Sequence, residues 1–161
     1  EWEGSGSFLH YEVLAWNDGK AHPILMRSQI PQGNARFYDG KVLESEYSMD
    51  TLYTWNGKKM VKEELPHQLP VKTNHRIEFS INDSYDVSLS ATSVTMKVGD
   101  TLQLRRMNRG VEERVLVSGD YFTFSQRGVM KAKTPGKTDI TIIPDGYSWN
   151  HAVHIAVTIL P

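Results

Sequence analysis

Three pairs of carboxylates are the residues of this 161-residue chain whose spacing could support acid–base chemistry. A glycoside hydrolase uses two carboxyl groups about 5–10 Å apart on either side of a cleft. Residues two apart in a β-strand point to the same face, so Glu44 and Glu46 would lie close enough together. Nothing else in the sequence indicates a substrate groove, and we interpret this pair as a solvated strand face. The other pairs are Glu63/Glu64 and Glu112/Glu113.

The histidines show no metal-binding spacing. His151 and His154 lie in an alternating run that predicts a strand, where residues three apart point to opposite faces. The other histidines also lack the spacing of zinc ligands: His10, His22, His67 and His75. The chain has no cysteine, phosphate-binding loop, nucleophile elbow or dinucleotide fingerprint. The sequence therefore predicts no catalytic residue, no metal ligand and no cofactor.

Aromatic side chains are the remaining candidates for a binding role, because their faces stack on sugars and anchor protein partners. The candidates are Trp16, Tyr53 and Trp55 in the first half, and Tyr147 and Trp149 near the C-terminus. Three further aromatic residues crowd the first group: Trp2, Tyr38 and Tyr47. The alternative interpretation is that these rings fill small cores, and that the C-terminal two pack over the open end of a sandwich.

Turn signals organise the first half of the chain. Asp-Gly or Asn-Gly dipeptides at 18–19, 39–40 and 56–57 tolerate the positive φ of tight hairpin turns. Around them the alternation predicts strands over 8–16, 24–30, 42–47, 51–55 and 58–62, an antiparallel meander of about five strands.

Residues 63–76 contain Pro66 and Pro70 and read as an irregular linker, followed by one more strand over 77–81. The sequence does not assign this strand to either half. We place the boundary near Asn82–Ser84, which gives domains 1–83 and 84–161.

The second half alternates in eight segments, which predict strands over 85–90, 94–98, 101–106, 114–117, 121–125, 129–132, 137–143 and 151–159. The inward-facing sets include Val94/Met96/Val98, Leu102/Leu104, Val115/Val117, Phe122/Phe124, Ile140/Ile142 and Val153/Ile155/Val157/Ile159. No window shows a sustained 3.6-residue apolar period of helical length, so the fold class is all-β.

Composition limits the function. Residues 1–83 carry nine Lys/Arg against twelve Asp/Glu, and residues 84–161 carry nine against seven. Neither half has the clustered basic charge of a nucleic-acid-binding protein. No segment approaches the 18 apolar residues of a membrane span.

Residues Val87 to about Ile159 resemble the bacterial immunoglobulin-like group 2 domain. The likeness lies in Val87-Ser88-Leu89-Ser90, in Met96-Lys97-Val98-Gly99-Asp100-Thr101-Leu102, in Gly128-Val129-Met130-Lys131-Ala132 and in Gly136-Lys137-Thr138-Asp139-Ile140-Thr141-Ile142. In the middle the chain departs from the family pattern, because Val115–Asp120 contains no Trp. The resemblance implies an Ig-like β-sandwich from a secreted or cell-surface bacterial protein, and it carries over no catalytic residue.

The first half resembles β-modules of secreted Gram-positive proteins, through Tyr11-Glu12-Val13-Leu14-Ala15-Trp16 and Tyr53-Thr54-Trp55-Asn56-Gly57-Lys58. Together these features predict an antiparallel β-meander followed by an Ig-like β-sandwich. We expect a non-catalytic accessory, spacer or adhesion region of an extracellular bacterial protein with further domains. The alternative is a glycan- or cell-wall-binding module attached to a larger hydrolase. The expected partner is a cell-surface glycan or another protein.

Overall fold

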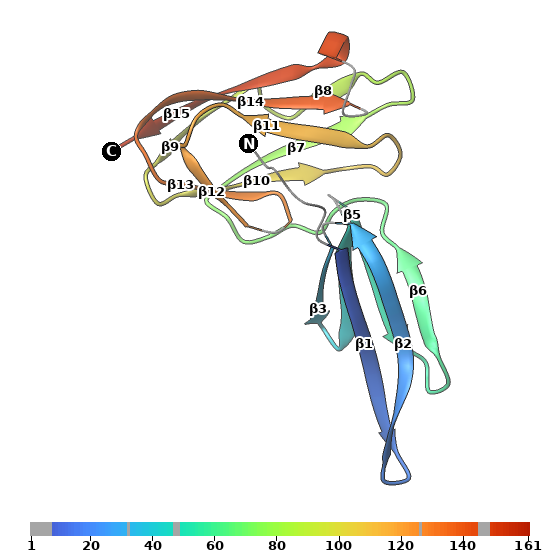
Figure 1. The fold of residues 1–161 in the computed structure, drawn as a ribbon. Coiled ribbons are helices and arrows are strands. Elements are labelled where there is room, and N and C mark those ends of the chain that lie inside the picture. Colours follow the sequence, from blue (N-terminus) through green and yellow to red (C-terminus); the bar gives the residue numbers. More distant parts are fainter. Residues whose placement is uncertain (1–7, 32, 47–48, 126, 145–148) are drawn as a thin grey trace. The chain divides into compact units, whose positions relative to one another are not determined.

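The computed structural model describes residues 8–31, 33–46, 49–125, 127–144 and 149–161. These residues form fifteen strands and one 3-10 turn, η1 (Trp149–His151), and contain no α-helix. The chain is therefore all-β, as the sequence predicts. Its contacts divide it into two compact units, Glu1–Leu65 and Pro66–Pro161 (Figure 1).

The first unit combines a long hairpin with a four-stranded meander. The hairpin consists of β1 (Phe8–Asn17) and β2 (Lys20–Pro31), which pair with each other only. The meander has the order β3-β4-β5-β6, all antiparallel. Its strands are β3 (Asn34–Tyr38), β4 (Lys41–Glu46), β5 (Met49–Trp55) and β6 (Met60–Glu64). The expected five-strand meander omitted β3 and did not separate the hairpin, whereas the described residues of this unit form six strands in two sheets.

The tight turns form where Asp-Gly and Asn-Gly predict them. Asp18 and Gly19 have φ values of 50° and 74°, and Asp39 and Gly40 have 48° and 71°. Two consecutive positive φ values define the turn whose twist matches that of paired strands. The Asn56 side chain accepts hydrogen bonds from the amides of Lys58 and Lys59, both at 3.0 Å, and so shapes the β5–β6 turn. These turns fix the register of three hairpins.

The second unit is a sandwich of two sheets (Figure 1). One sheet has the order β12-β13-β10-β7-β8, with a parallel β10–β7 pair, and the other has the order β11-β14-β15-β9, with a parallel β15–β9 pair. The strands are β7 (His75–Ile81), β8 (Val87–Leu89), β9 (Ser93–Lys97), β10 (Thr101–Arg106), β11 (Glu113–Val117), β12 (Phe122–Phe124), β13 (Val129–Ala132), β14 (Gly136–Pro144) and β15 (Val153–Leu160).

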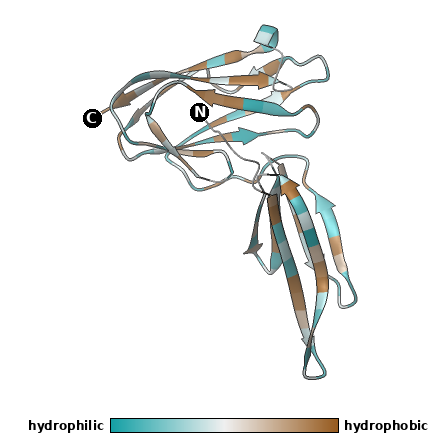
Figure 2. Cartoon of the chain, in the orientation of Figure 1, coloured by the Kyte–Doolittle hydropathy of each residue, from teal (hydrophilic) through white to brown (hydrophobic). Residues whose placement is uncertain are grey.

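Apolar side chains of both sheets meet in one cluster, in which Ile140, Ile142 and Ile155 are fully buried. Along β15 buried Ile155, Val157 and Ile159 alternate with more exposed residues, whereas residues 140–144 of β14 are all buried. Figure 2 shows the apolar stretches of these strands in brown. Every sequence-predicted inward residue of the second half lies in or against this core, with three exceptions. Val98, Val115 and Phe124 are 42 %, 38 % and 46 % exposed, because Val98 follows the end of β9 and the other two lie in the edge strands β11 and β12.

The division between the units falls after Leu65, earlier than the boundary expected near Asn82–Ser84. Strand β7 pairs in parallel with β10 and antiparallel with β8. Its inward residues Ile77, Phe79 and Ile81 are at most 2 % exposed and belong to the core of the second unit. The alternation of a strand does not reveal its pairing partner, so the sequence could not assign β7.

Candidate functional site

A buried carboxylate lies between the hairpin and the meander of the first unit. Glu44, in the middle of β4, is 2 % exposed. Arg27 of β2 donates two hydrogen bonds to it, from Nε to Oε2 at 2.9 Å and from Nη2 to Oε1 at 2.8 Å. The Tyr11 hydroxyl donates to Oε2 at 2.7 Å and the Tyr53 hydroxyl to Oε1 at 3.4 Å. We call these four residues the Glu44 cluster.

The electrostatics of the Glu44 cluster keep Glu44 ionised and both tyrosines protonated. Burial opposes ionisation of Glu44, yet the hydrogen bonds from Arg27 and Tyr11 outweigh it and hold the pKa of this carboxyl below its usual range. Burial, together with the negative charge of Glu44, raises the pKa of Tyr53 to about 12. Burial and the hydrogen bond to Glu44 also raise the pKa of Tyr11. The hydrogen bond to Glu44 raises the pKa of Arg27.

This arrangement corrects one expectation from the sequence. Glu44 is buried and does not lie on a solvated strand face, whereas Glu46, two residues further along β4, is half-buried. Both oxygens of Glu44 accept two hydrogen bonds, so the carboxylate is saturated with donors. The Glu44 cluster therefore ties the β1–β2 hairpin to β4 and β5, and a charge-assisted bidentate pair gives that tie a fixed geometry.

The sequence-predicted aromatic residues differ in exposure. Trp16 is 76 % exposed, Trp55 41 % and Trp149 61 %, whereas Tyr53 is 4 % exposed and belongs to the Glu44 cluster. The remaining candidates lie outside the described residues: Tyr147, and the neighbouring aromatics Trp2 and Tyr47. The structure thus exposes Trp16 and Trp55 on the first unit and buries Tyr53.

Sequence reasoning missed other exposed apolar residues of the first unit. Phe37 of β3 is 80 % exposed, and Met26 and Leu14 of the hairpin are 66 % and 55 % exposed. Glu12 is paired with Met26, and residues two apart in β1 share a face, so Leu14, Trp16 and Met26 lie on the face of the hairpin opposite Tyr11. The alternation of residues 8–16 was the available signal, but it does not tell which face is covered.

The C-terminal histidines have different neighbours. His151 Nδ1 lies 3.5 Å from a carboxylate oxygen of Asp86, and its ring lies 6.2 Å from that of Tyr85. His154 Nδ1 lies 3.0 Å from Thr141 Oγ1. Among the residues that the structure describes, no three His, Cys, Asp or Glu side chains gather in a way that could hold a metal ion.

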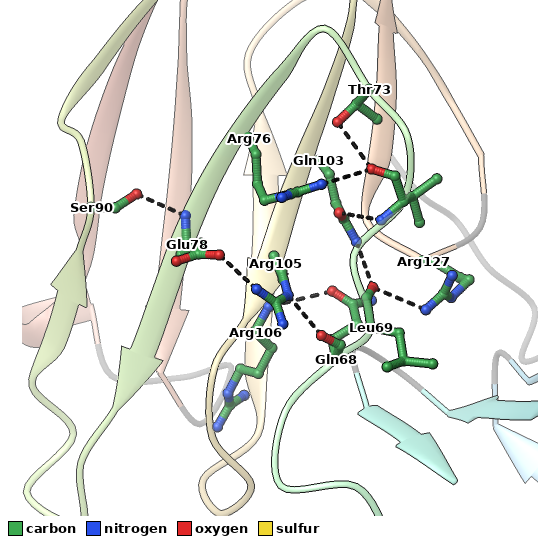
Figure 3. Close-up of polar contacts among 11 residues, drawn as sticks. Gln68, Leu69, Thr73, Arg76, Glu78, Ser90, Gln103, Arg105, Arg106 and Arg127 are labelled. Carbon is green, nitrogen blue, oxygen red and sulfur yellow. Dashed lines mark hydrogen bonds and ion pairs between the residues drawn. The ribbon is translucent and has the colours of Figure 1, made fainter. Parts of the chain in front are cut away.

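The segment that opens the second unit, residues 66–74, is held to that unit by side chains (Figure 3). We call it the connector. Gln103 of β10 is fully buried; its Oε1 accepts from Val71 N at 2.8 Å and its Nε2 donates to Leu69 O at 3.2 Å. Arg105 donates from Nε to Gln68 O at 2.7 Å and pairs through Nη1 with Glu78 at 2.7 Å. Sequence analysis treated the connector as an irregular linker, since backbone bonds to distant side chains leave no periodic signal.

Comparison of the chain with protein-family models, with curated proteins and with solved structures finds no match. No helix among the described residues has the length and apolar character needed to cross a membrane.

Proposed function

We propose that this chain is a non-catalytic adhesion region of an extracellular bacterial protein. In this proposal the first unit makes the binding contact, and the second unit is an Ig-like spacer that presents it. The observation that carries the proposal is the exposure of large aromatic side chains on the hairpins of the first unit, above all Trp16 at 76 %. Exposed aromatic residues are enriched where proteins bind partners, because each ring buries a large area at a small entropic cost.

The hydrogen bonds that fix the hairpin in the first unit and the connector in the second support this division of roles. The Glu44 cluster fixes the hairpin that carries Trp16 to the meander that carries Trp55. Preorganised elements bind with a smaller entropic penalty than mobile ones. In the second unit, Gln103 and Arg105 are engaged in holding the connector, which suits a structural module.

Retention of the purified chain on bacterial cell-wall preparations tests the proposal. We expect the double variant Trp16→Ala/Trp55→Ala to bind at least about tenfold more weakly, since removing a binding aromatic typically costs more than 1 kcal/mol. Trp149→Ala is the matched control: it removes a similarly exposed ring from the second unit, and its retention should equal that of the wild type.

Two results would contradict the proposal. One is wild-type retention by the double variant, which would remove the first unit from the contact. The other is hydrolysis of wall glycans by the chain itself, abolished by Glu44→Gln or Glu113→Gln, because that result would make the chain an enzyme.

A further inference from the structure

The three hairpins of the first unit end alike. In each, an exposed aromatic residue precedes the turn and a lysine follows it: Trp16 and Lys20, Tyr38 and Lys41, Trp55 and Lys58–Lys59. We call residues 16–20, 36–41 and 55–59 the turn end.

The strand order brings these three segments to one end of the first unit. In the meander the β3–β4 and β5–β6 turns lie at the same end of the sheet, because consecutive strands are antiparallel. The hairpin runs the same way: Leu9 and Ile30 lie against Gly33, just before β3, and Tyr11 and Arg27 then reach Glu44 further along β4. Figure 1 shows β1–β2, β3–β4 and β5–β6 turning at this common end.

Charge is divided between the turn end and the rest of the unit. The turn end carries five cations, Lys20, Arg36, Lys41, Lys58 and Lys59, against two anions, Asp18 and Asp39. The other described residues of the unit carry two cations against six anions: Arg27 and Lys62 against Glu12, Glu44, Glu46, Asp50, Glu63 and Glu64. The turn end therefore has a net positive charge and the other described residues of the unit have a net negative charge, and the two nearly cancel.

The cations of the turn end are available to a ligand. Within the described part of the chain, none of its four lysines forms an ion pair. The Arg36 guanidinium lies 5.8 Å from the ring centroid of Tyr38, which places a positive charge directly beside an exposed ring. Each of the three turns thus carries an exposed ring together with positive charge.

We infer that the turn end binds an anionic polysaccharide, a glycan chain that bears carboxylate or phosphate groups. This inference rests on the proposed function and names the ligand class of the same contact. Exposed rings offer stacking surfaces for the apolar faces of sugars, and unpaired lysines attract the negative groups. Asn17 and Asn56 beside the rings add side chains that can bond hydroxyl groups.

The reach of the hairpins favours an extended chain over a flat membrane surface. At about 3.3 Å per residue, the hairpin extends about 20 Å from Tyr11 to Asn17, whereas β4 extends about 10 Å from Glu44 to its turn. By the same measure Trp16, five residues beyond Tyr11, stands about 7 Å beyond Tyr38. It stands about 3 Å beyond Trp55, which lies four residues along β5 from Thr51, the partner of Glu44. The extreme tips, residues 17–20, 39–41 and 56–58, are polar and present no apolar side chain that could insert into a bilayer.

Binding of the full chain to defined polymers tests the inference. The anionic glycan probes are polygalacturonate, alginate and a polyol-phosphate wall polymer; dextran is the neutral glycan, polyglutamate the acidic peptide and phosphatidylglycerol vesicles the membrane. We expect at least one anionic glycan to bind at least about tenfold more tightly than the other three classes. We also expect this binding to weaken several-fold as salt is raised, because screening reduces the attraction between exposed charges.

Charge-removing variants locate the contact. Lys20→Gln/Lys41→Gln/Lys58→Gln/Lys59→Gln should weaken glycan binding at least about tenfold with an unchanged circular dichroism spectrum, since surface substitutions rarely alter stability. The control Lys97→Gln/Lys131→Gln/Lys137→Gln removes exposed lysines from the second unit and should bind within twofold of the wild type.

The outcomes separate this inference from the proposed function. Failure of all three anionic glycans, equal or tighter binding of polyglutamate, vesicles or dextran, or full binding by the four-lysine variant would each overturn the ligand class. The proposed function would survive any of these results if cell-wall retention still depended on Trp16 and Trp55, and it would fall with the ligand class if it did not.

Discussion

The second unit joins its two sheets through fourteen buried apolar side chains, whereas the first unit places an ionised carboxylate where its hairpin meets its meander. An apolar core gains stability from every methylene removed from water and is insensitive to pH. A buried charge contributes only while all its partners remain in place. The second unit also buries an ion pair, Arg106 with Glu113, but its two sheets meet through apolar contacts, whereas in the first unit the contact between hairpin and meander includes a charged cluster.

The largest expected effect comes from the core of the second unit. Ile155 is fully buried between the two sheets. Ile155→Ala should lower the free energy of unfolding of this unit by about 3–4 kcal/mol, because it leaves a cavity in a packed core. Hydrogen exchange of the full chain would show faster exchange of the amides of β14 and β15 with little change in β4 and β5. Val115→Ala, at a 38 % exposed site, should cost at most about 0.5 kcal/mol. Equal losses from the two variants would contradict a core at Ile155.

The matching change in the first unit is Glu44→Gln. It keeps the shape of the side chain but leaves the Arg27 guanidinium without a counter-charge. Because Arg27 is one-third exposed and can rehydrate, we expect a loss of about 2 kcal/mol, less than the 3–5 kcal/mol of a fully buried pair. Exchange should accelerate in β1, β2 and β4 and not in β14.

Glu46→Gln is the control for that change, since it alters a half-buried carboxylate two residues along the same strand. We expect its effect to stay within about 0.5 kcal/mol. If both variants behaved alike, the Glu44 cluster would not be what holds the hairpin, and the contrast between the two units would lose its basis.

The connector provides a smaller effect within the second unit. Gln103→Ala removes an acceptor from Val71 N and a donor to Leu69 O. Two lost hydrogen bonds predict about 1–2 kcal/mol, confined to residues 66–74. Limited proteolysis should then cut the connector faster, while Thr123→Ala, at an exposed site of β12, leaves the cleavage rate unchanged. Unchanged cleavage of the Gln103 variant would mean that the other bonds of the connector, such as those from Gln68 N to Arg106 O and from Arg105 Nε to Gln68 O, hold it without Gln103.

What the sequence predicts well is local. Strand alternation and turn dipeptides identify all eight strands from β8 to β15 and the tight turns of the first unit, because both signals depend on neighbouring residues. The structure explains why glycine occupies position 128, at the start of the Gly128–Ala132 motif, which the sequence alone does not. Its φ is +69°, and a Cβ there would stand 2.6 Å from Leu104 O, in the neighbouring part of the same sheet.

What the sequence misses depends on distant partners. No residue close to Glu44 in the sequence indicates that Arg27 and Tyr11 will bond to it. The sequence therefore predicts a solvated carboxylate where the structure has a buried one. Trp16 is exposed and Tyr53 is buried, although both lie in similar alternating segments. The local pattern therefore does not predict which ring is exposed. Candidate residues could be named from sequence, but their division into surface and interior required the packing of the hairpin on the meander.

The smallest effect sharpens the comparison at high and low pH. The folded-state pKa of Tyr53 is raised to about 12, so the stability that this hydroxyl contributes is present below its ordinary pKa of 10.0 and is lost as pH rises through the raised value. The pKa of Glu44 is lowered, so its contribution is present above its ordinary value and is lost as pH falls through the lowered one. The first unit should therefore lose stability at both extremes of pH. Because the pKa of Tyr11 is raised as well, absorbance titration of tyrosinate should show more than one late-ionising group; Tyr53→Phe should remove one of them, and Tyr38→Phe, at an exposed site, should remove none. The Tyr53 variant should cost at most about 1 kcal/mol at neutral pH, because the hydrogen bond it removes is long. Titration of every tyrosine near its ordinary pKa would show that the Glu44 cluster is open to water, and the hairpin would then be held by its apolar contacts.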